Sequence, residues 1–149
     1  NKTDAETARL SGDRSVTLAQ QPLTIYFDGS CPLCSVEIGH YARQRGADRL
    51  CFVDASDPGE TTGADLPREA AMRRFHVRAA DGRLLSGARA FVVIWDTLPA
   101  WRPLARLARL PGVIAVLEGA YRLFLPIRPL LSRVASALGA RPRRDGAAR

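Results

Sequence analysis

Short apolar runs alternate with polar, helix-forming stretches along the first half of this chain. Residues 23–27 and 49–54 are short, apolar and rich in β-forming side chains, so both predict buried strands. Between them Ile38 and Tyr41 recur at helical spacing, which predicts a helix that opens at or just after Cys31. Strand, helix and strand within about 30 residues predict a βαβ unit.

The second strand is expected to lead into a loop and then a second helix. Residues 55–64 contain Asp57-Pro58-Gly59, a strong turn signal. A helix is then expected from about Asp65 to Arg74, with Asp65 as its N-cap and Pro67 in its first turn.

A hairpin and a third helix follow in the pattern. Residues 75–80 and 83–85 flank Asp81-Gly82, which predicts a two-residue hairpin turn. Ser86 is expected to cap a helix over residues 88–98, whose apolar side chains share one side.

Beyond Trp101 the pattern is helical throughout. Apolar side chains dominate this segment, so its helices must pack on the domain, on each other or on a partner. Prolines are expected to divide it into short helical pieces at Pro103, Pro111, Pro126 and Pro129.

The predicted fold class is α/β, with the element order βαβα-ββ-α and a helical C-terminal extension. A chain of 149 residues can bury a core of its own as one domain. We expect residues 1–21 to form a flexible leader, residues 22–98 the α/β domain, residues 99–139 a helical extension packed on the same core, and residues 140–149 a disordered basic tail.

Composition adds little to this picture, because 46% hydrophobic and 25% charged residues are usual for a globular protein. The formal net charge is +7, but six of the arginines lie in the two terminal segments. The folded part is therefore less basic than the total implies, and no nucleic-acid partner is predicted.

The cysteine content and the chain start bear on the compartment. Three cysteines do not form the paired framework of a small secreted domain, and residues 1–7 lack the apolar core of a signal peptide. We therefore expect a cytoplasmic location. No transmembrane span is predicted either, because Glu118, Arg122 and Arg128 interrupt the apolar stretch over residues 110–131.

Two cysteines three positions apart carry the chemistry that the sequence suggests. Cys31 stands where the predicted helix opens, and the unpaired N–H groups and dipole of a helix N-terminus favour a thiolate there. Pro32 fits the first helical turn, where its missing N–H costs nothing. Cys34 returns to the same face one turn later, close enough to bridge to Cys31. We expect Cys31 to be the more exposed of the two and to have the lower pKa.

Two other interpretations of this pair stay open, namely buried inert cysteines and a structural zinc site. The further soft ligands available to zinc are Cys51, His40 and His76, without a second paired motif. We therefore predict no metal and no cofactor. Cys51, between two apolar residues of a strand, is expected to behave as a small buried hydrophobe.

Three more polar residues are candidates for a supporting role. Asp28 either accepts a proton and tunes the cysteines or forms the turn before Gly29. Glu37 is expected to be a carboxylate on the helix surface. His76 lies in a strand that could run beside the dithiol, where an imidazolium would lower a thiol pKa, but a half-buried structural histidine is the alternative.

The segment Tyr26-Phe-Asp-Gly-Ser-Cys-Pro-Leu-Cys34, with Glu37, resembles the signature of the DCC family of predicted thiol-disulfide oxidoreductases. That family is named for its Asp-x-x-Cys-x-x-Cys pattern and is regarded as thioredoxin-like. The resemblance extends over roughly residues 22–135. It implies a thioredoxin-like fold and identifies Asp28, Cys31 and Cys34 as the family's named residues.

The chain departs from thioredoxin-like redox proteins at one position. Such proteins usually place a cis-proline just before the third strand, facing the dithiol, whereas the nearest upstream proline here is Pro67, eight positions before Phe75. We therefore expect residues 74–76 to face the dithiol instead.

Two classes of function follow. The first is an enzyme that exchanges the Cys31/Cys34 dithiol with a disulfide-containing protein or a small thiol substrate through a mixed disulfide, with the direction of electron flow and the recycling reductant left open. The second is an interaction module whose C-terminal helices dock a partner or a membrane surface, with a redox-sensing or vestigial dithiol.

Overall fold

A four-stranded mixed sheet forms the centre of the protein, for which a computed structural model describes residues 22–142. The strand order is β2-β1-β3-β4. Strand β1 (Leu23–Phe27) pairs in parallel with β2 (Leu50–Asp54) and antiparallel with β3 (His76–Arg78), which pairs antiparallel with β4 (Leu84–Ser86). The predicted α/β fold with its βαβα-ββ-α order is confirmed, and it is consistent with a thioredoxin-like fold.

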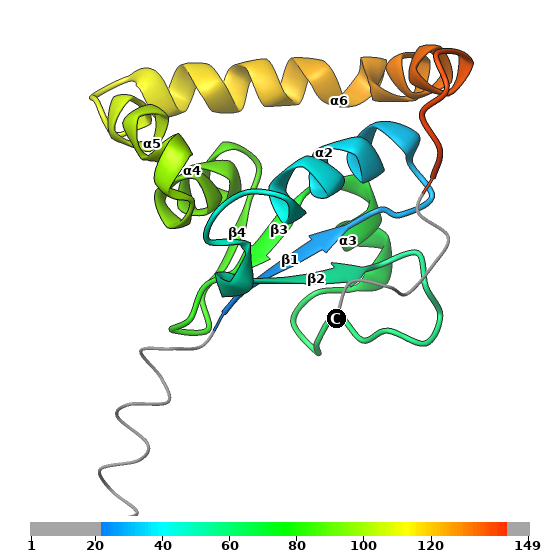
Figure 1. Cartoon of the computed structure of the whole chain (residues 1–149), viewed down its shortest axis with the longest axis horizontal. Helices are drawn as coiled ribbons and strands as arrows, with labels where there is room; N and C mark the ends of the chain where they lie inside the picture. Colours follow the sequence, from blue (N-terminus) through cyan, green and yellow to red (C-terminus); the bar gives the residue numbers. More distant parts are fainter. Residues whose placement is uncertain (1–21, 143–149) are drawn as a thin grey trace, which may run out of the picture.

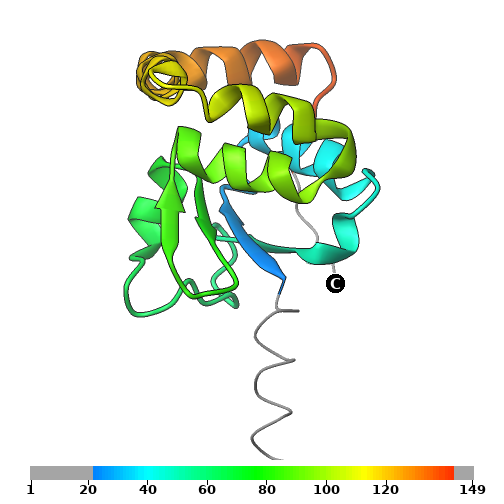
Figure 2. The same cartoon turned by 90° about the vertical axis from the view of Figure 1, so that its left-hand side faces the viewer.

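Helices cover both faces of the sheet and extend well beyond it (Figures 1 and 2). Helix α6 lies across α2 and α4 on the side away from the sheet (Figure 1). The helices are α2 (Pro32–Ala42), α3 (Arg68–Arg73), α4 (Ala88–Thr97), α5 (Arg102–Ala108) and α6 (Val113–Ala137), with 3₁₀ turns η1 (Ala47–Arg49) and η2 (Pro99–Trp101).

Strand β1 contributes to two separate clusters of the core. Consecutive side chains of a strand point to opposite faces. Ile25 accordingly packs in the larger cluster, which contains Ile38 of α2 and Ile94 of α4, whereas Tyr26 packs in a second cluster with Ala71 of α3. The larger cluster fixes α2, and with it the two cysteines, against the sheet.

The hairpin between β3 and β4 corrects the predicted two-residue turn. The Ala79 N–H donates to the Arg83 carbonyl and the Gly82 N–H donates to the Ala79 carbonyl, both at 2.9 Å, so three residues form the loop. Gly82 has a φ of 86°, which suits the left-handed position of such a three-residue loop. The Asp-Gly signal located the turn but not its length.

Two predicted helix caps are also wrong. Asp65 does not cap α3, because its carboxylate pairs with Arg78 at 2.6 Å. Ser86 belongs to β4, and the first N–H of α4, that of Ala88, instead donates to Glu118 of α6 at 3.0 Å. In both places a charged partner distant in the sequence decides the arrangement.

Helix α6 corrects the expected division of the C-terminal segment. Pro103 lies in the first turn of α5 and Pro111 lies between α5 and α6, as expected, but Pro126 and Pro129 lie inside a continuous helix of 25 residues. An interior proline removes a backbone hydrogen bond and costs about 3 kcal/mol. Contacts with the body of the protein offset that cost, among them the ion pair of 2.7 Å between Glu118 and Arg74.

The two ends of the chain and its C-terminal helices were also the subject of sequence predictions. The predicted leader and most of the predicted tail lie outside the described residues, and the division into residues 22–98 and 99–139 stays a prediction.

Within the described part of the chain, no single helix has both the length and the hydropathy to cross a membrane. The segments 99–108 and 113–137 meet that test only as a pair, with a bend of 103° between them.

Candidate functional site

The turn between β1 and α2 places Cys31 at the N-cap of α2, as the sequence predicts. Its backbone is extended there, and its sulfur accepts a hydrogen bond from the Cys34 N–H at 3.5 Å. Pro32 occupies the first helical turn. The sulfur therefore takes the place of the side-chain oxygen that usually caps a helix, where an anion is favoured.

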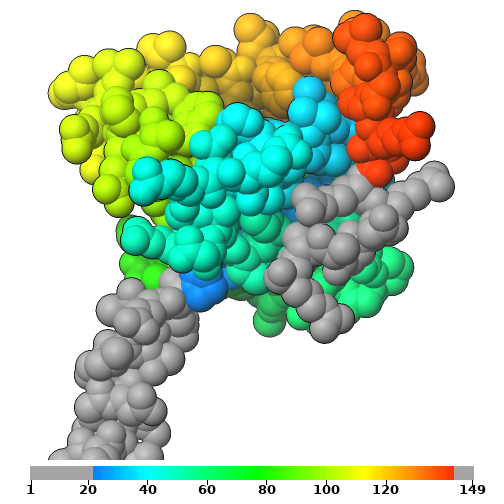
Figure 3. All heavy atoms as spheres, viewed as in Figure 1, coloured from blue at the N-terminus to red at the C-terminus, as the bar shows by residue number. Residues whose placement is uncertain are grey.

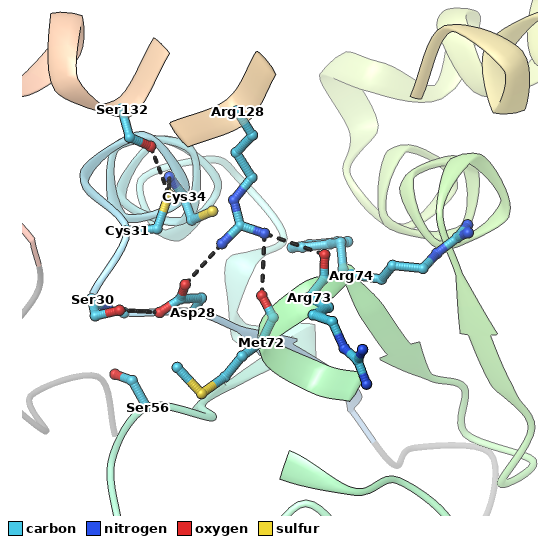
Figure 4. A network of polar contacts seen from close by, with 12 residues as sticks. Asp28, Ser30, Cys31, Cys34, Ser56, Met72, Arg73, Arg74, Arg128 and Ser132 are labelled. Atoms are coloured by element: carbon cyan, nitrogen blue, oxygen red, sulfur yellow. Dashed lines mark hydrogen bonds and ion pairs between the residues drawn. The ribbon is translucent and has the colours of Figure 1, made fainter. Parts of the chain in front are cut away.

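Helix α6 supplies two further polar groups to this sulfur (Figure 4). Ser132 places its hydroxyl oxygen 3.1 Å from the Cys31 sulfur, and the guanidinium of Arg128 donates to the Asp28 carboxylate at 2.8 Å. Arg128 also donates to the Met72 carbonyl at 3.2 Å. The side chains of Arg128 and Asp28 are only 16% and 13% exposed. The cation is thus held in one position beside the two cysteines.

These contacts lower the pKa of Cys31 to about 4. The largest contribution is a hydrogen bond from the Cys34 thiol, and Ser132, the Cys34 N–H and Arg128 add further hydrogen bonds that favour the thiolate. Burial opposes them, since it disfavours the charged form. The predicted direction of the pKa of Cys31 is confirmed.

Cys34 behaves in the opposite way. Its hydrogen bond to Cys31 and its burial both raise its pKa, against the positive charge of Arg128. The two thiols thus share one proton, which stays on Cys34 while Cys31 carries the charge.

The expectation that Cys31 is the more exposed cysteine is wrong. Cys31 is buried, with 7% of its surface exposed, whereas Cys34 is partly exposed. The reason is that Ser132 of α6 lies directly over the Cys31 sulfur, while the Cys34 sulfur points away from that contact (Figure 4). Helix α6, which begins more than 80 residues later in the sequence, covers the helix end that is open in the local sequence pattern.

Asp28 forms the turn and also orients the cation. One carboxylate oxygen accepts hydrogen bonds from the backbone N–H and the hydroxyl of Ser30, and the other accepts from Arg128. Its carboxylate thus contacts the serine of the turn and the arginine of α6. Both groups donate hydrogen bonds to Asp28. These contacts therefore favour the interpretation that Asp28 positions Arg128 over the interpretation that it accepts a proton.

Glu37 is not the surface carboxylate that was expected. It accepts a hydrogen bond from the Tyr41 hydroxyl at 3.0 Å, and that hydroxyl accepts one from Trp95 at 3.3 Å. Burial raises the pKa of Glu37, and the Cys31 thiolate adds to the rise. Glu37 thus lies in an apolar setting near the dithiol, where its neutral form is favoured.

An apolar groove of about 350 Å³ opens beside Cys34. Helices α2, α4 and α6 and the segment before β3 form its walls, and Glu37 and Arg128 are among its few polar side chains. Its apolar lining includes Leu33, Met72, Phe75, Phe91, Tyr121 and Phe124. Arg74 and Phe75 line the groove with Cys34, so residues 74 and 75 do face this side of the dithiol.

The remaining candidates lie apart from the two sulfurs. Burial lowers the pKa of His76, and a ring nitrogen of His76 contacts the Arg74 carbonyl at 2.7 Å. Cys51 is exposed on the edge strand β2 and is not the buried hydrophobe that was expected. Within residues 22–142, no three His, Cys, Asp or Glu side chains gather in a way that could hold a metal ion. The expectation that no metal is bound stays a prediction.

The sequence interpretation missed Arg128, Ser132 and Asp54. The Asp54 carboxylate, at the end of β2, accepts a hydrogen bond from the Gly29 N–H at 2.8 Å and another from the Ser56 N–H. An Asp at the carboxyl end of a strand parallel to β1 was a usable signal, because such ends meet at one edge of the sheet. No local signal identified Arg128 or Ser132 among the residues of α6.

Gly29 gives a direct test of this turn. A Cβ at residue 29 would overlap the Asp54 carboxylate, so Gly29→Ala is expected to lower the free energy of unfolding by about 2 kcal/mol or more, through overpacking and a lost hydrogen bond. Urea unfolding measures the change. Gly119→Ala is the matched control, because the space around Gly119 is open, and it is expected to leave stability unchanged or slightly raised. Equal effects of both substitutions would contradict the close packing at Gly29.

Comparison with known protein families agrees with the geometry of this site. The family model described as DCC1-like thiol-disulfide oxidoreductase matches residues 25–134, a range that contains both cysteines, Asp28, Arg128 and Ser132. A search of curated proteins and a search of solved structures found no match.

Proposed function

The chain belongs to the DCC1-like thiol-disulfide oxidoreductase family, and we propose that it exchanges electrons with substrate disulfides through Cys31 as nucleophile and Cys34 as resolving thiol. A general role in thiol-disulfide exchange follows from the family and the paired cysteines. The observation that supports the division of roles is the pair of opposite pKa directions, with Cys31 lowered to about 4 and Cys34 raised.

The proposed reduction of a substrate runs in two steps. The Cys31 thiolate attacks one sulfur of the substrate disulfide, which breaks the S–S bond, forms a mixed disulfide and releases a substrate thiolate that takes up a proton. Cys34 then loses its proton and attacks the Cys31 sulfur, which forms the Cys31–Cys34 disulfide and releases the second substrate thiol. Two electrons and two protons pass to the substrate, and the reverse sequence oxidises a dithiol.

The surroundings suggest how a substrate is received. Ser132 must move aside so that a substrate sulfur can reach Cys31, because its hydroxyl now occupies that position. The apolar groove beside Cys34 can receive an apolar side chain next to the substrate disulfide. The substrate is therefore proposed to be a protein or small molecule with apolar groups beside its disulfide.

Alkylation of the reduced protein tests the nucleophile. With a pKa of about 4, Cys31 is already a thiolate at pH 5.5, so its reaction rate with iodoacetamide is expected to be nearly constant from pH 5.5 to pH 8. An ordinary thiol with a pKa of about 8.5 would react roughly 200-fold faster over the same interval. Mass spectrometry of the peptides assigns each rate to its cysteine. N-acetylcysteine in the same buffers is the control.

Two outcomes would contradict the proposal. One is a Cys31 rate that rises with pH as steeply as that of N-acetylcysteine. The other is faster alkylation of Cys34 than of Cys31 at pH 6, which would exchange their roles. The cytoplasmic location and the recycling reductant stay predictions for experiments in cells.

A further inference from the structure

The outer face of α6 is apolar along its whole length and is uncovered in the described part of the chain. Val116, Leu123 and Leu130 are 71%, 74% and 62% exposed. Figure 3 shows α6 along the upper rim of the molecule, where its outer side chains lie open. The exposed apolar positions of this face, called the α6 stripe below, are Val116, Ala120, Leu123, Ile127, Leu130, Val134 and Ala137.

The α6 stripe lies opposite the side chains that serve the dithiol. Arg128 and Ser132 point from α6 towards α2 and the turn before it (Figure 4). At about 100° per residue, they fall on the side of the helix away from the stripe. The stripe is therefore not part of the core or of the thiol site, and no contact within residues 22–142 explains its composition.

The width and edges of the stripe distinguish between possible occupants. With Leu131 and Pro126, which are also exposed, the apolar face spans roughly 140° of the helix, which is wider than the seam of a coiled coil. Coiled-coil seams are usually flanked by charges of both signs that pair between helices. Here the edge carries Gly119, Pro126 and Arg133, so a second copy of α6 would find no opposite charge on this side.

The positive charge of the C-terminal helices indicates an anionic partner. Residues 99–142 contain seven arginines and a single acidic residue, Glu118, which is already paired with Arg74 and Arg122. Arg122 and Arg133 are exposed along one edge of the stripe. Arginines beside an apolar helix face can extend to lipid phosphates while the apolar side chains enter the bilayer interface.

We propose that the α6 stripe binds the surface of a bilayer that contains anionic lipids, with α6 lying in the plane of the interface. The sheet then faces away from the bilayer, since α6 lies on the outer side of α2 and α4. Helix α5 and the turn after it add Leu107 and Leu110, which are exposed beside Arg106 and Arg109, to the same kind of surface. The proposal does not rest on the thiol chemistry, because none of its residues contacts a cysteine.

Vesicle flotation with the full chain tests this proposal. Binding is expected to vesicles of phosphatidylcholine with 30% phosphatidylglycerol, and to be at least tenfold weaker with phosphatidylcholine alone. The triple variant Leu123→Gln/Ile127→Gln/Leu130→Gln is expected to lose at least tenfold in affinity. Arg122→Gln/Arg133→Gln is expected to lose roughly 20-fold, since each arginine near an anionic surface contributes about fivefold.

The control variant is Arg45→Gln/Arg49→Gln, which removes two exposed arginines near η1, on the far side of the molecule from α6 (Figure 1). Its binding is expected to equal that of the wild type. Thermal unfolding of every variant checks folding, and Leu123→Gln alone replaces the triple variant if that variant unfolds.

Three outcomes would overturn the proposal. The first is no binding to anionic vesicles, and the second is equal loss in the control. The third is a dimer of the wild type in sedimentation equilibrium that the triple variant abolishes, since the stripe would then be an interface between two copies of the chain. None of these outcomes bears on iodoacetamide alkylation, so the proposed thiol exchange stands or fails separately.

Discussion

Replacing Cys34 with serine is expected to trap a covalent complex with a disulfide substrate, while replacing Cys31 with serine abolishes exchange. The Cys31 thiolate, stabilised at the N-cap of α2, can still attack a substrate disulfide when Cys34 is absent. The second step then has no nucleophile, so the mixed disulfide persists. Cys31→Ser removes the thiolate at the N-cap and leaves only Cys34, whose pKa is still raised by burial.

The expected magnitudes are large. Cys31→Ser should lower the rate of exchange about 10³-fold or more, because the hydroxyl that replaces the thiolate is not ionised near pH 7. Cys34→Ser should lower turnover to a similar extent while it leaves the first step possible. That first step is retained but slowed, because the hydrogen bond from Cys34 helps to hold the pKa of Cys31 low, so trapping by Cys34→Ser is expected to be slower than wild-type attack at pH 6.

A non-reducing gel with a fluorescent model disulfide measures both variants. The trapped band should appear with Cys34→Ser, vanish with dithiothreitol and be absent with Cys31→Ser. Cys51→Ser serves as the control, because Cys51 is exposed on β2 and lies outside the site. Equal trapping by both variants, or by neither while the wild type turns over, would refute the assignment of nucleophile and resolver.

The sequence predicted the elements whose signals are local. The apolar run over residues 23–27 predicted β1 from neighbouring residues alone. The hairpin was located by Asp81-Gly82, but its length depends on the pairing of Ala79 with Arg83, which involves both strands. Pro126 and Pro129 led to a wrong prediction of two helix breaks. Their local preference to end a helix was overridden by the packing of α6 on α2 and α4.

The candidate site also contains residues that local sequence predicts and residues that only the distant helix α6 supplies. Cys31, Pro32 and Cys34 were predicted correctly at the start of α2, because the strand, turn and helix around them are continuous in sequence. The exposure of Cys31 could not be predicted, because Ser132 covers it from 101 positions away. Likewise, the sequence offered His76 as one candidate for a cation beside the thiols, whereas in the structure Arg128 is that cation.

Arg128→Gln is expected to lower the reduction potential of the dithiol. The guanidinium favours the Cys31 thiolate and lies between Asp28 and the carbonyl of Met72. Among the groups that lower the pKa of Cys31, Arg128 contributes least, so its removal should raise that pKa by about one unit. The thiolate exists only in the reduced protein, so its stabilisation favours the reduced form and raises the reduction potential.

The sign and size of the change in potential follow from that linkage. Losing the stabilisation makes the reduced form less favourable, so the reduction potential of Arg128→Gln should fall by about 30 mV at pH 7, at roughly 30 mV for each tenfold change in the thiolate equilibrium. Arg128→Lys keeps the charge but cannot bridge the same partners, so an intermediate potential is expected.

The variant also leaves the Asp28 carboxylate buried without its cation, which could unfold the turn by itself. The double variant Asp28→Asn/Arg128→Gln removes that unpaired charge, and it should keep the lowered potential while it regains stability in urea unfolding. Arg133→Gln is the matched control on the same helix, because Arg133 is exposed and lies outside the contacts of Cys31. Equilibration with glutathione buffers measures each potential. A potential of Arg128→Gln equal to that of Arg133→Gln would show that α6 covers the dithiol without tuning it.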